Sequence, residues 1–427
     1  MRHLYTLLLS LLTPLIVLRL LIKSRQLLAY RQRIGERFAF LPAGTEPVAV
    51  WVHAVSVGES LAALPMIEAL VSRHGAGRVW VSTTTPTGSE RIQAALGDRV
   101  RHSYAPYDLP GVVARFLDRV RPGQVVVMET ELWPNLFHQL RQRDIPLTIA
   151  NARLSPRSFA GYGRVPGFTR SVLQCVTTVA AQSPLDAERF LSLGAPDVLP
   201  VGNIKFDVSP PAAEPALVPL IRSEFSSPRP IWIAASTHQG EEDVVLQAHD
   251  SVRKLLPACL LILVPRHPQR FDEVARGLER RGTPFIRRSA LVEGKAGLGQ
   301  QAAVLLGDSM GEMWGYLMAA QLAFVGGSLV PVGGHNVLEP AALALPVLFG
   351  PEMHNFLAAR DLLLGSKAAE QIADAASLAE AVTALLGDAS RRRTMGAAGA
   401  AAVEANRGAL QRLLQLLAGP DQKNSQP

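Results

Sequence analysis

The sequence predicts an α/β protein of two domains, each built on a doubly wound parallel sheet. Its 427 residues exceed the size at which a single hydrophobic core stops growing. Short apolar runs rich in β-branched residues alternate with helical stretches, a pattern typical of parallel sheets covered on both faces. A segment rich in Pro, Ala and Ser, residues 209–229, interrupts this alternation. We interpret it as the linker between the domains.

The elements follow in order along the two predicted domains, residues 26–208 and 230–420. Strands are expected at residues 48–54, 79–84, 124–128, 147–150, 177–181 and 198–201, and then at 231–235, 260–264, 303–306, 322–325 and 346–349. Helices are expected to close the chain at 377–386 and 400–417. Because open α/β sheets bind ligands at the carboxyl ends of their strands, we expect two Rossmann-like domains facing a cleft.

Residues 1–25 are predicted to form a membrane anchor. From Leu4 to Leu18 the chain carries no charge, and after Arg19 three more apolar residues follow. This length is marginal for a spanning helix, which needs about 20 apolar residues, so the segment either spans the bilayer or lies in its interface. Lys23 and Arg25 begin a basic flank, which places the rest of the chain on the cytoplasmic side and favours contact with anionic lipid.

The composition favours acidic partners but does not choose among them. The formal net charge is +7, which suits nucleic acid, anionic lipid or phosphorylated small molecules. A basic stripe interleaved with aromatic residues is missing, so we expect no nucleic acid. Cys175 and Cys259 are both expected to be core thiols. No P-loop, HExxH or Asp-x-Asp pattern occurs, so we expect chemistry without a metal ion.

The first candidate site follows the first strand, in the run VHAVSVGES. Ser56 and Gly58 precede a helix that is expected to begin near Glu59, at the carboxyl edge of the sheet. Glu59 is either a general base for a hydroxyl group or a first-turn carboxylate that stabilises the helix dipole. Gly58 favours the functional interpretation, because a glycine in this turn lets backbone N–H groups approach a ligand. A glutamate with an unperturbed pKa of about 4.3 is ionised at neutral pH, as a base must be.

Two further strand ends carry polar residues on the same predicted edge. Thr83 and Thr85 offer hydroxyl groups to an acceptor or to phosphate. Glu129 and Glu131 are two residues apart, so on a strand they would share one face. The alternatives are a buried network partner for Glu129 and a helix-start carboxylate for Glu131.

The second domain has the stronger candidate site, a glycine-rich block over residues 324–351. In it Gly327 and Gly334 permit close backbone approach, and Asn336 and Glu339 lie where a helix begins, a place suited to anions. The remaining candidates share positions at strand ends or beside the linker, and they are Ser236, Thr237, Arg266, Met310 and Lys205. The forked guanidinium of an arginine suits phosphate. The block therefore predicts a nucleotide-sugar site.

Taken in order, these motifs resemble one known family. VHAVSVGES, TTTPTG, METELWPN, GNIKFD, STHQGEE, LVPRHPQRF, GDSMGEM and AFVGGSLVPVGGHNVLEPAA match the 3-deoxy-D-manno-octulosonic acid (Kdo) transferases of lipid A assembly. The resemblance implies a GT-B glycosyltransferase at the inner membrane that moves Kdo from CMP-Kdo to the lipid A precursor, lipid IVA. It further implies inversion at the anomeric carbon and no metal.

The resemblance also implies roles for the candidate residues. Glu59 would be the general base that acts on the 6'-hydroxyl of the acceptor. CMP would be held by Ser236, Arg266, Met310, Asn336 and Glu339 and the nearby glycines, with Lys205 facing the donor's phosphate or carboxylate. One or two Kdo units are both compatible with the sequence. The alternatives are another GT-B enzyme with a UDP-sugar donor, and a non-catalytic protein that binds anionic sugars.

Overall fold

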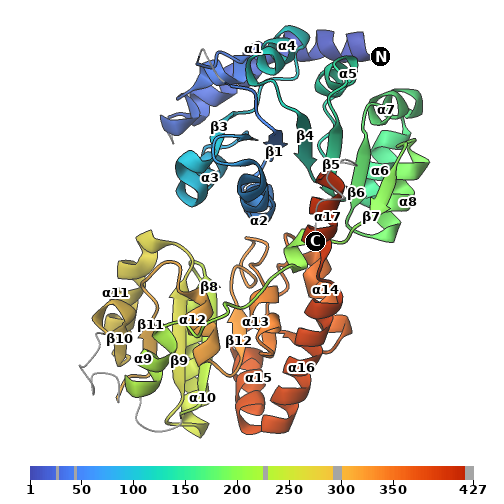
Figure 1. Cartoon of the computed structure of the whole chain (residues 1–427). Helices are drawn as coiled ribbons and strands as arrows, with labels where there is room; N and C mark the ends of the chain where they lie inside the picture. The colour runs from blue at the N-terminus through green and yellow to red at the C-terminus, as the bar shows by residue number, and fades with distance from the viewer. Residues whose placement is uncertain (26–27, 43–45, 225–228, 292–300, 419–427) are drawn as a thin grey trace. The chain divides into compact units, whose positions relative to one another are not determined.

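The computed structural model describes residues 1–25, 28–42, 46–224, 229–291 and 301–418 (Figure 1). The chain forms two compact units. Unit 1 comprises residues 1–207 together with the chain from Arg407 onward, and unit 2 comprises residues 208–406. Each unit contains one seven-stranded sheet in which all paired neighbours run parallel, which confirms the predicted fold class.

The sheet of unit 1 has the strand order β3-β2-β1-β4-β5-β6-β7. Its strands are β1 (Val50–His53), β2 (Val79–Thr83), β3 (Arg101–Tyr104), β4 (Gln124–Met128), β5 (Leu147–Ala152), β6 (Thr178–Ala181) and β7 (Val198–Pro200). The chain builds outward from β1 to β3 and then returns to place β4 on the other side of β1. The order therefore reverses between β1 and β4, and open sheets bind ligands at such a switch point.

Helices pack on the sheet of unit 1 (Figure 1). Hydrophobic clusters of buried side chains lie on both faces of this sheet. The α-helices are α1 (Arg2–Lys23), α2 (Val57–His74), α3 (Pro86–Leu96), α4 (Pro110–Val120), α5 (Pro134–Gln142), α6 (Pro156–Gly163), α7 (Pro166–Leu173), α8 (Pro184–Ser192) and α17 (Ala409–Leu417). Short 3₁₀ turns are η1 (Leu28–Tyr30), η2 (Ile34–Phe38), η3 (Gly97–Arg99) and η4 (Ile204–Phe206). Side chains alternate along a strand, so Trp51 joins one cluster while Val50 and Val52 join the other.

Unit 2 repeats this plan with the strand order β10-β11-β9-β8-β12-β13-β14. Its strands are β8 (Ile231–Thr237), β9 (Leu260–Pro265), β10 (Phe285–Arg287), β11 (Val304–Leu306), β12 (Ala323–Val325), β13 (Val347–Phe349) and β14 (Ala369–Gln371). Its helices are α9 (Leu217–Glu224), α10 (Glu241–Leu255), α11 (Phe271–Arg281), α12 (Met313–Ala319), α13 (Leu338–Ala342), α14 (Leu357–Gly365), α15 (Ala375–Gly387) and α16 (Ala389–Ala405), with 3₁₀ turns η5 (Pro268–Arg270) and η6 (Arg288–Ala290). The switch point of this sheet lies between β8 and β12.

Three strands were not expected from the sequence, and all three lie at sheet edges. β3 is one edge of the first sheet, and β10 and β14 are the two edges of the second. The burial of their residues is mixed, whereas β1 is buried throughout. An edge strand buries less of its surface than a central one, so it lacks the continuous apolar run that reveals a central strand.

The predicted linker, the predicted last helix and the predicted end of the second domain each need a correction. The segment interpreted as a linker contains the helix α9, whose Leu217, Val218 and Ile221 are buried, with Leu217 and Ile221 in a core cluster of unit 2. Residues 400–417 do not form one helix, because α16 ends at Ala405 and α17 begins at Ala409. Unit 1 contains α17, which was predicted to belong to the second domain (Figure 1, red).

The sequence also made predictions about the N-terminal helix and about the burial of the two cysteines. α1 is long and apolar enough to cross a membrane, and 6% of its most apolar window is buried. This is consistent with a membrane anchor, although signal sequences share these properties. Cys259 is buried as expected, whereas Cys175, which follows the end of α7, is only half-buried.

Candidate functional site

The first cluster of candidate residues lies at the switch point of unit 1, beyond the ends of β1 and β4. Ser56 is the N-cap of α2 and accepts a hydrogen bond from the backbone N–H of Glu59 at 3.2 Å. Serine is favoured at this position because its hydroxyl satisfies a backbone donor that the first helical turn leaves unpaired. Gly58 lies in that first turn, and the loop after β4 carries Glu129 and Glu131 toward the same edge.

The carboxylate of Glu59 is held by the loop that precedes its own helix. One oxygen accepts from the backbone N–H of Val55 and the other from the hydroxyl of Ser56, both at 2.8 Å. Glu59 is buried, with 8% of its surface exposed. Because a carboxylate has about four lone-pair sites, each oxygen can still accept a further hydrogen bond. Glu59 is therefore oriented without being saturated.

The structure changes the expected acidity of Glu59. Burial raises the pKa of this carboxyl above its ordinary value, the charges of Glu129 and Glu131 raise it further, and the hydrogen bonds from Val55 and Ser56 oppose the shift. The expectation of an unperturbed pKa was therefore wrong. A higher pKa makes the carboxylate a stronger acceptor for a proton, which suits a base better than the unshifted value.

Glu129 and Glu131 differ in their partners and do not share a strand face. β4 ends at Met128, Glu129 has a φ of 55° in the turn that follows the strand, and Glu131 lies just after this turn. Glu129 forms an ion pair with Lys205 at 3.1 Å, and Glu131 accepts from the indole of Trp133 at 3.0 Å. Burial raises the pKa of Glu131. The ion pair places Lys205 on the acidic side of unit 1, where it balances part of the negative charge around Glu59.

The threonines after β2 use their hydroxyl groups inside the protein. Thr83 is fully buried, and its hydroxyl lies 3.1 Å from Nε2 of His102. Thr85 is the N-cap of α3 and accepts from the backbone N–H of Gly88 at 3.2 Å. The expectation that Thr83 would contact an acceptor is therefore not supported by its position, because no part of this side chain is open to a ligand.

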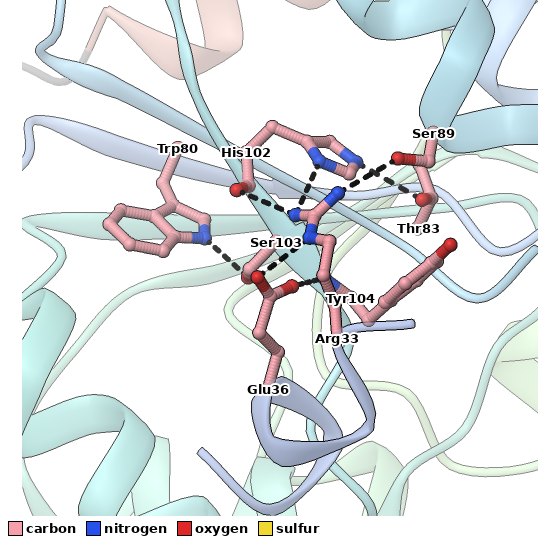
Figure 2. A network of polar contacts seen from close by, with 8 residues as sticks. All are labelled: Arg33, Glu36, Trp80, Thr83, Ser89, His102, Ser103 and Tyr104. Atoms are coloured by element: carbon pink, nitrogen blue, oxygen red, sulfur yellow. Dashed lines mark hydrogen bonds and ion pairs between the residues drawn. The ribbon is translucent and has the colours of Figure 1, made fainter. Parts of the chain in front are cut away.

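A network of polar contacts joins the segment after α1 to this strand end (Figure 2). Figure 2 shows the guanidinium of Arg33 among Glu36, Ser89 and His102. It donates to the carboxylate of Glu36 at 2.7 Å, to the hydroxyl of Ser89 at 3.2 Å, and to Nδ1 and the carbonyl oxygen of His102 at 3.3 and 3.2 Å. Burial and the charge of Arg33 lower the pKa of His102 to about 3, so its imidazole is neutral. Arginine can only donate, so Nδ1 of His102 accepts from Arg33 and Nε2–H donates to Thr83. The segment that follows the apolar helix is thus fixed to the edge that carries Glu59.

In unit 2 the glycine-rich loop after β12 is organised by a glutamate that the sequence analysis did not single out. Glu241, the first residue of α10, is fully buried. Its carboxylate accepts from the backbone N–H groups of Gly327, Ser328 and Leu329 at 2.7, 3.0 and 2.9 Å, and from His238 N–H at 2.9 Å. These amide groups are therefore hydrogen-bonded to Glu241, and the expected contact of Gly327 with a donor stays a prediction.

Two glycines of the block permit contacts that a side chain would prevent. Gly327 has a φ of 67°, and a Cβ there would lie 2.9 Å from the ring of His335. Gly334 has a φ of 77°, and its Cβ would lie 2.3 Å from the sulfur of Met353. Both positions combine a left-handed backbone with close packing, so they require glycine for structural reasons.

The remaining candidates of unit 2 meet at the ends of β8, β9 and β12. His238 and His335 are stacked, with their Nε2 atoms 2.7 Å apart. Burial, with the nearby charge of Arg266, lowers the pKa of His335 to about 3, so its ring is uncharged, and burial also lowers the pKa of His238. The side chain of Asn336 donates to Glu339 at 3.1 Å, and burial raises the pKa of Glu339 while Arg266 opposes that shift. Arg266, Asn336 and Glu339 thus form one polar group at the switch point.

The other predicted donor residues differ in exposure. Ser236 adopts a left-handed backbone with a φ of 58° where β8 changes register, and it is half-buried. Thr237 is fully buried, so its side chain supports the strand end and does not face a ligand. Met310 is 52% exposed in the loop after β11, and a ligand could cover it. Among the described residues, no group of three or more His, Cys, Asp or Glu side chains is suited to hold a metal ion.

Glu241 had a weak signal in the sequence. Glu241 follows a glycine in STHQGEE, at the start of the helix after the first strand of its sheet, which is the place that Glu59 occupies in unit 1. This correspondence could have directed attention to it. Its partners lie 86–88 residues further along the chain, however, and only the return of β12 to the side of β8 brings them together.

Comparisons with known proteins agree with this architecture. A crystal structure of a glycosyltransferase from Rickettsia africae aligns with 89% of this chain and 100% of that chain at a TM-score of 0.55 and 13% identity. The two parallel α/β units are those of the GT-B glycosyltransferases. A family model described as 3-deoxy-D-manno-octulosonic-acid transferase (kdotransferase) matches residues 32–208.

Two curated relatives carry the same description over nearly their full lengths. The 3-deoxy-D-manno-octulosonic acid transferase of Haemophilus influenzae is 42% identical over 97% of this chain and 98% of the relative. The corresponding protein of Bordetella pertussis is 38% identical over 97% and 98%. This chain therefore belongs to the Kdo transferase family.

Proposed function

We propose that this protein transfers Kdo from CMP-Kdo to the 6'-hydroxyl of lipid IVA, the lipid A precursor, with inversion at the anomeric carbon. Family membership supports the transferred sugar. The observation that carries the mechanism is the oriented carboxylate of Glu59, half-satisfied by Val55 and Ser56 at the switch point of unit 1. A second Kdo, added to the first by the same base, is compatible with this proposal.

In the proposed reaction Glu59 accepts the proton of the acceptor hydroxyl as its oxygen attacks the anomeric carbon. The bond from that carbon to the phosphate oxygen breaks, and CMP leaves with the electron pair. The raised pKa of Glu59 favours proton acceptance. Lys205 limits the repulsion between neighbouring carboxylates by pairing with Glu129. The hydrogen bonds from Ser56 and Val55 keep Glu59 in one rotamer, so little reorganisation is needed at the moment of transfer.

We assign the donor to unit 2. Arg266 would bind the phosphate of CMP, because a guanidinium forms paired hydrogen bonds with phosphate oxygens. Asn336 and Glu339 would bind polar groups of the donor from the same switch point, with Met310 and Ser236 at its margin. Thr237, Gly327 and Gly334 contribute by shaping the backbone around these residues. The reaction as written needs no metal ion.

The proposed location is the cytoplasmic face of the inner membrane. The apolar helix α1 and the basic residues that follow it support attachment to anionic lipid. A membrane-bound protein meets a lipid acceptor without extracting it from the bilayer. The partners are therefore CMP-Kdo, lipid IVA and anionic lipid, with no nucleic acid.

The test is a transfer assay with purified full-length protein, CMP-Kdo formed in situ, and lipid IVA in detergent with EDTA. Wild type, Glu59→Gln and the control Glu68→Gln are compared, with products identified by mass. Glu68 lies on the same helix as Glu59 but is exposed, 3.6 Å from Arg99. We expect transfer by wild type and by Glu68→Gln, and a loss of about 10²–10⁴-fold for Glu59→Gln. The product mass counts the Kdo units added.

Other outcomes separate the alternatives. If the folded wild type binds CMP but transfers no Kdo, the proposal fails and UDP-sugars become the donors to test. If it binds an anionic sugar without turnover, the protein is a binding protein. Equal transfer by wild type and Glu59→Gln would keep the enzyme and remove Glu59 as its base. Loss of transfer in EDTA that added Mg²⁺ restores would overturn the metal-free mechanism.

A further inference from the structure

The N-terminal helix α1 is packed against unit 1 along one side. Its partly or fully buried positions include Tyr5, Leu9, Thr13, Leu20 and Ser24. These positions are four or seven residues apart, that is, one or two helical turns. This spacing is the period of one helix face. The docked face therefore runs from the first turn of the helix to its end, a length of about 30 Å.

Polar contacts fix the first turn of α1 to unit 1. The hydroxyl of Thr6 lies 3.0 Å from Oδ1 of Asn135, and the hydroxyl of Tyr5 donates to the carboxylate of Asp108. Asp108 is 4% exposed and also accepts from the backbone N–H groups of Asn135 and Leu136 at 3.0 and 2.7 Å. The start of α1 is thus joined to the start of α5, the helix that follows Glu131.

The opposite face of α1 is apolar and open. It presents Leu4, Leu8, Leu11, Leu15, Leu18 and Ile22, each between 50% and 66% exposed. An open apolar row of this length on a folded unit marks a surface that contacts another molecule or a membrane. The row is continuous along the helix, in the same direction as the docked face.

The charges around this face fit an anionic lipid surface. Arg2, Arg19, Lys23 and Arg25 lie on or beside α1, and no acidic residue occurs before Glu36 in the sequence. A second copy of the same face would bring these positive charges together, and like charges repel. The headgroups of anionic lipids complement them, while the acyl chains complement the leucines.

From this geometry we propose that α1 lies in the plane of the membrane interface, between unit 1 and the lipid, and does not cross the bilayer. A helix that crosses the bilayer has its two ends about 30 Å apart in depth, with lipid around its centre. Here the first turn of α1 is bonded to Asp108 and Asn135, and buried positions continue along the helix to Ser24, so crossing would draw Asp108 and Asn135 into or through the hydrocarbon. The cost of burying such groups in lipid opposes that arrangement.

The in-plane helix also places the switch point of unit 1 near the lipid surface. Asn135, which contacts α1, is four residues from Glu131, and Trp133 between them contacts both the carboxylate of Glu131 and the ring of His53 at the end of β1. This consequence rests on the proposed function, whereas the orientation of α1 does not. The orientation can therefore be tested without any measurement of activity.

The test measures the depth of single positions on α1 in vesicles. Full-length protein carrying Cys175→Ser receives one cysteine at position 8, 11, 15 or 18 on the open face, or at 9 or 20 on the docked face, and each is labelled with a fluorescent nitrobenzoxadiazole group. Cys259 stays unlabelled because it is buried and burial raises its pKa to about 12. Vesicles contain phosphatidylcholine and phosphatidylglycerol with bromine at a shallow or a deep acyl carbon.

We expect the four open positions to be quenched equally and most strongly by the shallow bromine, and the two docked positions to stay unquenched. Quenching that is deepest at position 11 and shallow toward both ends, on all faces, would show a helix that crosses the bilayer and overturn the proposal. Absence of quenching together with a dimer in sedimentation would assign the face to a second copy, which also overturns it.

Two further measurements use the contacts and the charges. The pair Thr6→Cys and Asn135→Cys should be joined by a short bismaleimide in membrane-bound protein as readily as in detergent, and loss of this crosslink in membranes would overturn the docked arrangement. Arg19→Gln with Lys23→Gln should weaken binding to anionic vesicles about 25-fold and leave binding to neutral vesicles unchanged, since each charge contributes about fivefold. Equal binding to both vesicle types by wild type would contradict the role of charge.

Discussion

At the scale of single residues, two glutamates in corresponding places have different tasks. Each lies in the first turn of the helix that follows the first strand of its sheet, Glu241 as the first helical residue and Glu59 as the third. Glu241 is fully buried and satisfies four backbone N–H groups, so it is a structural anchor for the loop after β12. Glu59 has two partners and retains capacity to accept a proton and a further hydrogen bond. The number of satisfied donors, and not the position in the helix, separates the two roles.

The acidity of Glu59 makes a prediction about pH. A base is active only when it is deprotonated, so the kcat/KM of transfer should fall as pH decreases through the raised pKa of Glu59. Glu131→Gln removes a negative charge that raises this pKa, so the acid limb of the profile should move to lower pH. Lys205→Met leaves Glu129 without its cation, so the limb should move to higher pH.

The measurement is kcat/KM against pH for wild type and the two variants, with CMP binding as the control for folding. Opposite displacements of the acid limb are the expected result. If both variants keep the wild-type limb, the titrating group is not Glu59, or its neighbours do not act on it through charge.

At the scale of elements, close backbone contacts decide where helices pack. Gly396 lies inside α16, and a Cβ at this position would lie 1.9 Å from the carbonyl oxygen of Ala344, in the turn after α13. Gly387 is the last residue of α15, and a Cβ there would meet no atom within 4 Å on a backbone that is not left-handed. The two glycines look alike in the sequence but have different surroundings.

This difference predicts opposite effects of the same substitution. Alanine favours a helix over glycine by about 1 kcal/mol. Gly396→Ala should nevertheless destabilise unit 2 by about 1–3 kcal/mol, because the overlap exceeds the gain in propensity. Gly387→Ala should be neutral or slightly stabilising. Chemical denaturation followed by circular dichroism measures both. A stabilised Gly396→Ala would show that α16 does not pack against Ala344 as described.

At the scale of the whole molecule, the chain leaves unit 1 after Asp207 and returns to it with α17. Asp207 accepts from the backbone N–H groups of Gly408 and Leu410 at 2.6 and 2.7 Å, so the outgoing and returning segments are tied together. Leu413 is fully buried in a core cluster of unit 1. The stability of unit 1 therefore depends on a segment that begins 201 positions beyond Asp207.

Leu413→Ala should destabilise unit 1 and leave unit 2 unaffected. The loss of a buried leucine side chain costs about 2–5 kcal/mol. Hydrogen exchange resolved by peptide should show faster exchange in β1 and α2, with unit 2 unchanged. The matched control is Leu385→Ala on α15, which is also fully buried but lies in unit 2, and it should show the reverse pattern. Uniform acceleration in both units would mean that they unfold together.

The sequence by itself determined the fold class and most central strands. A buried parallel strand must be apolar on both faces, so β1, β4, β8 and β9 appear as continuous apolar runs. It also indicated candidate strand ends, because Arg266 directly follows the run of β9 and Glu59 lies in the first turn of the helix after β1. The edge strands β3, β10 and β14 and the helix α9 escaped prediction because their burial depends on neighbours that are distant along the chain.

Only the tertiary structure decided what each polar group does. In the sequence Thr83 is an ordinary strand-end residue and Glu241 an ordinary helix-start residue. In the structure the hydroxyl of Thr83 is hydrogen-bonded to His102, and the carboxylate of Glu241 accepts from the loop after β12. The pKa of Glu59 depends on Glu129 and Glu131, which the switch in strand order brings beside it. The burial and the electrostatic surroundings of a side chain depend on residues far apart along the chain. Local sequence does not show which of these residues lie close together in space.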